Sequence, residues 1–287
     1  MKINKITPQG YCGGVINALN IVNNTINDAS IPRPIYLLGN IIHNKHVVND
    51  LKKKGIIVID NKNKTRLELL DLIDSGTVIF SAHGVSPEVY LKAKEKGLFI
   101  VDAVCPNVNI VHKNIKRHLD DGYCCLYVGT SNHPECEGVL GIDKRIKFIS
   151  SVNDINSLDI SNDKIYVTNQ TTLSKYDLED IYIKLKNKYP NIYIDDKICN
   201  ATTIRQEAMA NQEKVDLCIV VGDKESSNTK KLANVSQNIA GIKTILCEDL
   251  KSLDKNALEN INCISISSGA STPSHIVDEI IEYLKQK

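Results

Sequence analysis

The chain of 287 residues is 42% hydrophobic, and its 35 lysines and arginines nearly cancel its 34 aspartates and glutamates. This balance gives no reason to expect a nucleic acid or an acidic membrane surface as a partner. No apolar run approaches the ~20 residues that cross a bilayer, and Met1 leads toward GYCGG without a signal-peptide pattern. Nine cysteines, an odd number in a chain too long to need disulfides, indicate a reducing compartment. We therefore expect a soluble globular protein of two or three domains.

Short runs rich in β-branched residues alternate with helical patterns along the chain. The helical patterns include residues 108–122 and 176–190, which end at Gly and Pro. Continuous apolar strands separated by helices predict parallel sheets covered on both faces, with ligands bound beyond the carboxyl ends of the strands. The expected strands are 35–39, 55–60, 77–84, 98–105, 124–129, 164–170, 191–199, 216–222, 243–247 and 263–269.

Three cysteines each precede a helical stretch at a regular interval. Cys12 and Cys105 are 93 residues apart, and Cys105 and Cys199 are 94 apart, which suggests three α/β units with one thiol each. A helix N-terminus, indicated for Cys105 by Pro106, favours the thiolate that binds metals. The three thiols could bind zinc with a fourth ligand, or an iron–sulfur cluster with one iron free of protein. The remaining strand cysteines are expected in the core: Cys124, Cys125, Cys218, Cys247 and Cys263.

Polar residues follow several of the expected strands. Histidines stand directly after three of them, and the segments 226–228 (SSN) and 269–272 (GAST) add hydroxyls, an amide and backbone N–H groups before helices. Taken singly, such residues are often surface histidines or helix N-caps. Together they could bind a diphosphate, with Glu135 or Thr171 moving a proton. We expect Glu135 and the histidine before it to share one side of an extended loop. The histidines are His43, His83 and His133.

Nine motifs, in order, resemble those of the 4-hydroxy-3-methylbut-2-enyl diphosphate reductases, the LytB family. They are GYCGGV, HNKHVV, FSAHGVSPEV, DAVCPNV, HPECEG, VTNQTTLS, ICNATTIRQEA, VVGDKESSN and SSGASTP. The resemblance implies reductive removal of the substrate's allylic hydroxyl, giving isopentenyl and dimethylallyl diphosphates at the end of the methylerythritol phosphate (non-mevalonate) isoprenoid pathway. It also implies an α/β fold with three similar domains, mainly parallel sheets, arranged as a cloverleaf around a central cluster. The implied domains are 1–100, 101–196 and 197–269, with residues 270–287 packing back on the first.

The same resemblance assigns roles by motif. Cys12, Cys105 and Cys199 would hold a 4Fe–4S cluster with one open iron site, and Glu135 would supply a proton with Thr171 and His133 beside it. Electrons would come from a ferredoxin- or flavodoxin-type protein with its NADPH-dependent reductase, since no GxGxxG motif occurs here. The substrate would be bound by His43, His83, His133, Thr171, Ser226, Ser227, Asn228 and Ser271.

Two other functions fit part of the sequence. A zinc hydrolase would use the three thiolates, and a phosphosugar-binding module would use the SSN and GAST segments without the cysteines. We expect a monomer. The many Asn, Lys and Ile residues indicate an AT-rich genome, and we favour a plastid (apicoplast) stroma over the bacterial cytoplasm.

Overall fold

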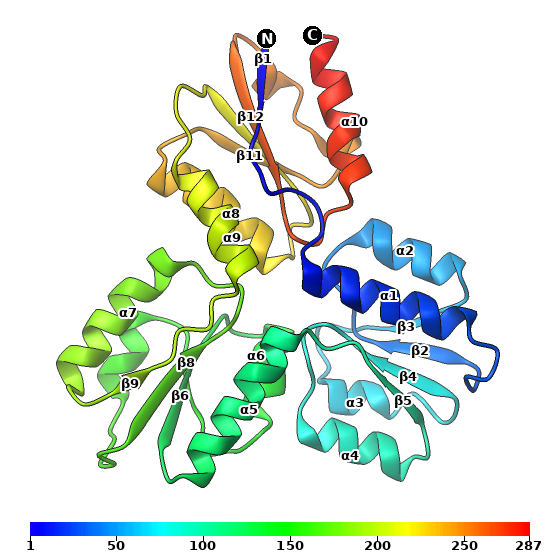
Figure 1. The fold of residues 1–287 in the computed structure, drawn as a ribbon, viewed down its shortest axis with the longest axis vertical. Helices are drawn as coiled ribbons and strands as arrows, with labels where there is room; N and C mark the ends of the chain where they lie inside the picture. The colour runs from blue at the N-terminus through cyan, green and yellow to red at the C-terminus, as the bar shows by residue number, and fades with distance from the viewer. The chain divides into compact units, whose positions relative to one another are not determined.

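The computed structural model describes residues 1–287 and contains three four-stranded sheets, in which all neighbouring strands are parallel (Figure 1). The chain divides into two compact units. Unit 1 comprises residues 1–15, 43–47 and 199–287, and unit 2 comprises residues 16–42 and 48–198. Unit 1 holds one sheet and unit 2 holds two. The expected parallel α/β fold is confirmed, while the cloverleaf arrangement stays a prediction.

The first sheet, in unit 2, has the strand order β3-β2-β4-β5. Its central strand β4 is buried along its whole length, which explains the unbroken apolar run Val78–Phe80. Leu69, Leu70 and Val89 from its helices pack against that strand. The elements are α1 (Gly13–Asn27), β2 (Ile35–Leu38), α2 (Lys45–Lys53), β3 (Ile57–Ile59), α3 (Arg66–Leu70), β4 (Thr77–Phe80), α4 (Pro87–Glu95) and β5 (Phe99–Asp102).

The second sheet, also in unit 2, has the order β7-β6-β8-β9. Its two faces carry separate apolar clusters, because alternate side chains of β6 point to opposite sides: Leu126 packs toward α7 and Tyr127 toward α5 and α6. The elements are α5 (Pro106–Asp120), β6 (Cys124–Val128), α6 (Pro134–Leu140), β7 (Lys147–Ile149), a 3-10 helix (Val152–Ser157), β8 (Ile165–Asn169), α7 (Lys175–Lys188) and β9 (Tyr193–Ile194).

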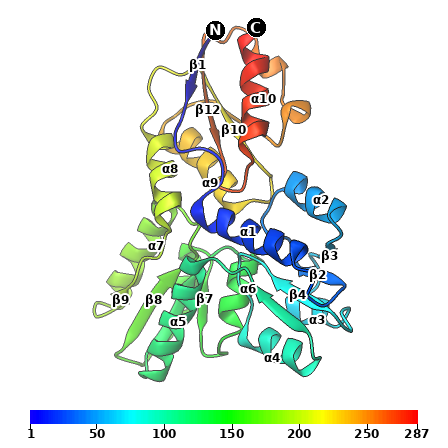
Figure 2. The same ribbon diagram turned by 45° about the vertical axis from the view of Figure 1, so that its right-hand side comes forward.

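The third sheet, in unit 1, joins the two ends of the chain. Its order is β1-β12-β10-β11, and Lys2 on β1 pairs with Cys263 on β12. Helix α10 lies along this sheet in Figures 1 and 2. Ile276 and Ile280 of this helix share an apolar cluster with residues of the strands. The elements are β1 (Lys2–Lys5), α8 (Asn200–Ala210), β10 (Leu217–Val221), α9 (Ser227–Asn234), a π-helix (Val235–Ile239), β11 (Thr244–Cys247), two 3-10 helices (Leu250–Ser252 and Asn256–Leu258), β12 (Cys263–Ser268) and α10 (Ser274–Lys285).

The three sheets share one topology. Numbered along the chain within each sheet, the strands of the first and second sheets lie in the order 2-1-3-4. The third sheet has the same order if β10, β11 and β12 are its strands one to three and β1 is its fourth. In every sheet the fourth strand then leads to a cysteine and a helix: β1 to Cys12, β5 to Cys105 and β9 to Cys199. This shared topology explains the intervals of 93 and 94 residues between the cysteines.

All ten expected strands are present, and two short ones, β1 and β7, were not expected. The ends of the chain also differ from expectation. Residues 2–5 lie in the third sheet and not in the first domain, and residues 274–285 pack on that same sheet. The reason is that residues 199–287 supply only three strands of this sheet, and β1 provides the fourth. Helix α10 contacts β1 and covers one face of the sheet.

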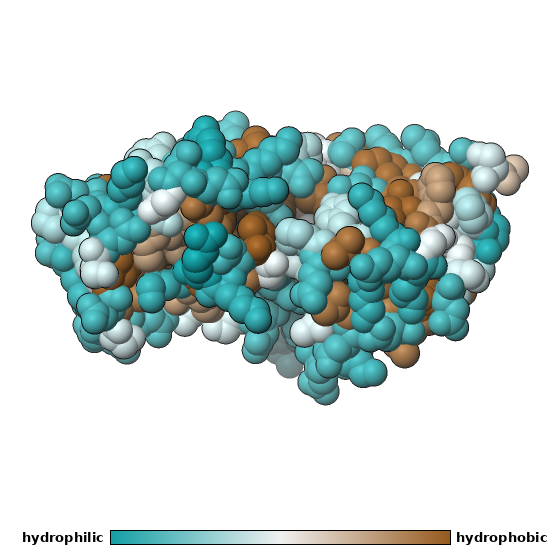
Figure 3. Space-filling view, turned by 90° about the horizontal axis from the view of Figure 1, so that it is seen from below, coloured by the Kyte–Doolittle hydropathy of each residue, from teal (hydrophilic) through white to brown (hydrophobic).

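Hydrophilic residues cover most of the face seen in Figure 3, with hydrophobic residues between them. None of the helices has the length and apolar character required to cross a membrane.

Candidate active site

The predicted binding residues follow the first or third strand of a sheet in every case. These two strands are neighbours at the centre of the 2-1-3-4 order, and their connections leave toward opposite sides. Their carboxyl ends form a topological switch point, the place where α/β sheets bind ligands. The first strands are followed by His43, His133 and Ser226–Asn228, and the third strands by His83, Thr171 and Ser271.

The three predicted cysteine ligands stand at helix N-termini. Cys105 and Cys199 are the N-cap residues of α5 and α8, and Cys12 directly precedes α1. All three are partly exposed. Cys125, Cys218 and Cys247 are buried in strands as expected, but core positions were wrong for Cys124 and Cys263, which lie at strand starts and are partly exposed. No side chain caps α5 or α8 by a hydrogen bond, so the N-cap cysteines leave the first N–H groups of these helices without a side-chain acceptor. The N-terminal end of a helix carries partial positive charge, which attracts anionic groups.

Arg205 supplies a fixed positive charge near two of these thiols. Its side chain is 3% exposed and donates to the carbonyl oxygens of Gly10 (2.9 Å) and Ala201 (3.1 Å), while its Nε has no partner. Burial lowers the pKa of Arg205, and Cys12 and Cys199 oppose this through their negative charge. No carboxylate pairs with the guanidinium. A cluster held by thiolates carries net negative charge, so the residues present fit such a group.

In unit 1, a short polar chain connects a thiol to the SSN segment. Cys199 Sγ lies 3.3 Å from Thr202 Oγ1, and this hydroxyl donates to Asn228 Oδ1 (3.5 Å). The Nδ2 of Asn228 is buried without a partner. Ser226 is the N-cap of α9 and accepts from the N–H of Thr229, so the N-cap interpretation is confirmed for this serine. A buried amide donor at a helix N-terminus suits an anionic ligand.

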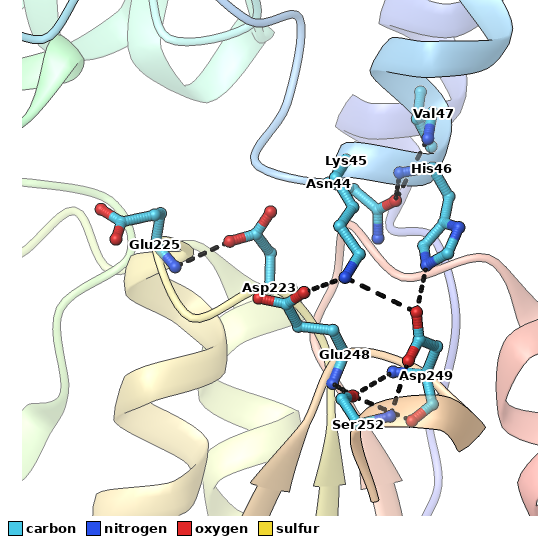
Figure 4. A network of polar contacts seen from close by, with 9 residues as sticks. All are labelled: Asn44, Lys45, His46, Val47, Asp223, Glu225, Glu248, Asp249 and Ser252. Carbon is cyan, nitrogen blue, oxygen red and sulfur yellow. Dashed lines mark hydrogen bonds and ion pairs between the residues drawn. The ribbon is translucent and has the colours of Figure 1, made fainter.

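The segment that carries His43 belongs to unit 1 and is held there by ion pairs of the residues that follow it (Figure 4). Asn44 Oδ1 accepts from the N–H groups of His46 and Val47 and so begins α2. Lys45 pairs with Glu248 and Asp249, and His46 Nε2 lies 3.1 Å from Asp249 Oδ2. The hydrogen bond and charge of Glu248 raise the pKa of Lys45.

A second contact holds the His43 backbone itself. The hydroxyl of Ser271 donates to the His43 carbonyl oxygen (3.0 Å). Two residues predicted to bind substrate therefore meet in unit 1, and Ser271 has a structural contact as well as its predicted binding role.

In unit 2, His133 and His83 lie together. Their rings meet edge to face, with centroids 5.5 Å apart. The expected extended loop is wrong, because His133 is the N-cap of α6 and Glu135 lies inside the first turn. The N–H of Glu135 donates to Nδ1 of His133 (3.1 Å). With Nδ1 accepting, the neutral ring carries its proton on Nε2, which makes Nε2 a donor.

Glu135 is a buried carboxyl group surrounded by hydrogen-bond donors. It is 1% exposed. The N–H of Thr171 donates to Oε1 (2.8 Å), the Thr171 hydroxyl to Oε2 (3.0 Å), and the Tyr127 hydroxyl to Oε1 (3.4 Å). Burial raises the pKa of Glu135 to about 7, against the lowering effect of these three bonds. A carboxyl that titrates near neutral pH can give up a proton in a reaction and regain it from water.

Sequence reasoning missed three residues of this arrangement: Tyr127, Thr202 and Arg205. Thr202 and Arg205 follow Cys199 at helical spacing, i+3 and i+6, so a helical plot from the cysteine would have placed Thr202 beside it. Tyr127 lies in the apolar run CCLYV and carries no signal of its own.

Comparison with known proteins identifies the family. A sequence model of the LytB protein family matches residues 3–285. The chain belongs to the LytB family. Membership implies dependence on an iron–sulfur cofactor. Every predicted site residue of this LytB chain lies within the matched range.

Curated and solved relatives of the LytB chain have one activity in their names. The 4-hydroxy-3-methylbut-2-enyl diphosphate reductases of Geobacillus sp. (strain WCH70) and Geobacillus kaustophilus (strain HTA426) are 49% and 48% identical to it over 288 residues, covering all of this chain and 91% and 90% of theirs. The E-1-hydroxy-2-methyl-but-2-enyl-4-diphosphate reductase structure from Plasmodium falciparum superposes with a TM-score of 0.91 at 36% identity, over 99% of this chain and 88% of that one. A second structure, of a reductase titled the terminal enzyme of the non-mevalonate pathway, has a TM-score of 0.68 at 28% identity over all of both chains.

Proposed function

We propose that this LytB protein is a 4-hydroxy-3-methylbut-2-enyl diphosphate reductase. It would remove the allylic hydroxyl as water, taking up electrons and protons, and release isopentenyl and dimethylallyl diphosphates. The observation that carries the proposal is the family match over residues 3–285, combined with a buried carboxyl, Glu135, that titrates near neutral pH. The first supplies the reaction class and the second a group that this reaction needs.

The proposed cofactor is a 4Fe–4S cluster held by Cys12, Cys105 and Cys199, with one iron open to the substrate. When bound, it supplies electrons and a Lewis acid for the leaving hydroxyl. Support comes from the thiols at helix N-termini and from Arg205, whose buried charge has no carboxylate partner. The protein's task at this group is to hold the thiolates and to balance their charge.

The diphosphate would be bound by donors from the switch points of the sheets. Nε2–H of His133 and Nδ2 of Asn228 are buried or partly buried donors suited to phosphate oxygens. The segments that present them are fixed by capping bonds, so little freedom is lost when substrate binds. The other proposed diphosphate-binding residues are His43, His83, Ser226, Ser227 and Ser271.

Glu135 would deliver the proton, and Thr171 would position it. Both oxygens of the carboxyl are held by Thr171, one by its N–H and one by its hydroxyl. The Thr171 hydroxyl can donate to Glu135 when the carboxyl is ionised and accept from it when the carboxyl is protonated. This exchange gives a path for one proton between Glu135 and a substrate hydroxyl near Thr171.

The reaction also requires an electron donor, for which we propose a ferredoxin- or flavodoxin-type protein with its NADPH-dependent reductase. A monomer in a plastid stroma or bacterial cytoplasm remains part of the proposal. A zinc hydrolase and a phosphosugar-binding module fit less well, because neither accounts for family membership over the full chain.

Anaerobic purification with iron and sulfide analysis tests the cofactor. The protein should be brown, with absorbance near ~400 nm that bleaches on reduction. Cys105→Ser, and likewise Cys12→Ser and Cys199→Ser, should lose most iron and nearly all turnover, because a hydroxyl is a poorer iron ligand than a thiolate. Cys124→Ser, in β6, is the matched control and should keep its iron. Iron retained in Cys105→Ser but lost in Cys124→Ser would contradict the ligand assignment.

Turnover with an artificial one-electron donor tests the acid. Glu135→Gln keeps the shape of the side chain but has no proton to give, so kcat should fall by ~10²-fold or more. Substrate should still bind to the oxidised enzyme, as followed by spectroscopy. Near-normal turnover with an intact cluster would remove Glu135 from this role.

A further inference from the structure

Tyr127 is a buried tyrosine that the proposed reaction does not yet use. It lies in β6, its side chain is 0% exposed, and its hydroxyl donates to Glu135 Oε1 at 3.4 Å. Burial raises the pKa of Tyr127 well above its ordinary value. The hydroxyl therefore stays protonated near neutral pH and can act as a donor.

The hydroxyl of Tyr127 has two possible acceptors. One is the Glu135 carboxylate, and the other is the sulfur of Cys136, the next residue on α6. Cys136 is itself buried, and its thiol, whose pKa burial raises, donates to Gln170 Oε1 (3.5 Å). A carboxylate is a much stronger acceptor than a neutral thiol, whereas a protonated carboxyl is a weak one. The tyrosine bond to Glu135 is therefore stronger when Glu135 is ionised.

The surroundings of Glu135 contain few other groups that could set its charge. Thr171 approaches from the segment after β8, Tyr127 from β6, and Cys136 and His133 from α6. The Glu135 carboxyl makes no ion pair with a lysine, an arginine or a histidine. Its proton affinity thus depends on burial and on three donated bonds, of which the Tyr127 bond is the longest and the easiest to remove without moving the backbone.

We propose that Tyr127 is a positioning residue for the proton donor: its hydroxyl stabilises ionised Glu135 and so sets the pH at which Glu135 exchanges its proton. This inference rests on the proposed role of Glu135 as the acid. It predicts that loss of the hydroxyl leaves the acid in place but makes it hold its proton more tightly.

The test is Tyr127→Phe in the cluster-loaded enzyme. The carboxyl band of Glu135 is followed by infrared difference spectroscopy as a function of pH, and is identified by its absence in Glu135→Gln. The proton affinity of Glu135 should rise three- to tenfold, which is roughly half to one pH unit. The alkaline limb of the kcat profile with an artificial donor should move to higher pH by the same amount. Tyr127→Leu, a second variant without the hydroxyl, should move both in the same direction.

Tyr166→Phe is the matched control. Tyr166 is equally buried in the neighbouring strand β8, but its hydroxyl donates to Asp195 (2.7 Å). Its loss should leave the Glu135 band unmoved. An unchanged band in both Tyr127 variants, or an equal shift in Tyr166→Phe, would overturn the inference. Failure of the proposed function would look different: Glu135→Gln would keep its turnover, whatever the infrared band does.

Discussion

Glu135→Gln should stabilise the second sheet at alkaline pH. The pKa of this carboxyl is about 7 in the folded protein and near 4.5 when exposed. Because the folded pKa is raised, the folded state favours the protonated carboxyl. Its contribution to stability is full below about pH 4.5 and is lost as the pH rises through about 7. A difference of about 2.5 between the two pKa values corresponds to about 3 kcal/mol. A glutamine escapes this cost because it never ionises.

The geometry allows the glutamine to fit. Its Oε1 can accept from the N–H of Thr171, and its Nε2 can donate to the Thr171 hydroxyl, which rotates to accept. We expect the free energy of unfolding of Glu135→Gln, relative to wild type, to grow by about 2–3 kcal/mol between pH 5 and pH 8.

Hydrogen exchange of peptides from β6 and β8 measures this quantity locally and does not require the whole chain to unfold in one step. Exchange rates are corrected at each pH for the intrinsic rate. Glu135→Asp, which still ionises, is the matched control and should keep the pH dependence of wild type. If wild type and Glu135→Gln opened with the same pH dependence, the pKa of Glu135 would not be raised by burial.

Three further changes test other parts of the site. His133→Ala should raise KM and slow turnover, a loss of about 1.5–3 kcal/mol for one charge-assisted bond, seen in steady-state kinetics; an unchanged KM would place this histidine away from the diphosphate. Arg205→Met should lower the midpoint potential of the cluster, because a positive charge favours the more negative, reduced form, and Arg205→Lys should lower it less. Redox titration measures the potentials, and equal values in wild type and both variants would contradict the charge-balancing role. Gly129→Ala should destabilise the second sheet by about 1–3 kcal/mol, since the added methyl would lie 2.5 Å from Cys136 Sγ; unchanged hydrogen exchange of β6 would show that the sulfur can move aside.

Local sequence patterns were enough to predict the strands that are buried on both faces. Runs such as TVIF (β4) and LCIVV (β10) are continuous and largely apolar. They are too short for a buried helix, so a strand is the favoured interpretation. The strands β1 (KINK) and β7 (KFI) were not predicted, because they are short and contain lysine. Their extended conformation depends on pairing with β12 and β6, which no local pattern shows. No local signal pairs Lys2 with Cys263 at the other end of the chain.

The position of the three proposed cysteine ligands before helices could be predicted because the signal is local. Pro106 followed by a helical pattern favours an N-cap position for Cys105, because proline is common at the first helical position. By contrast, the helix position of Glu135 was missed because HPECEG is short enough to be a loop or a helical turn. The burial of Arg205 depends on Gly10, almost two hundred residues away, so the arginine looks like an ordinary solvated helix residue in the sequence.

The late closure of the third sheet has a consequence for biosynthesis. A ribosome delivers residues 16–198 before β10 and β12 exist, so the chain that carries Glu135 and Thr171 can fold while β1 still lacks a neighbour. Cys12 donates its backbone N–H to Ala270 and is fixed only when that residue has emerged. A nascent chain halted before residue 263 would contain all three cysteines and yet lack β12, the strand that pairs with β1. For the proposed cluster, Cys12 makes this backbone contact only after nearly the entire chain has been translated, so we expect the thiols of the nascent protein to depend on a reducing environment until then.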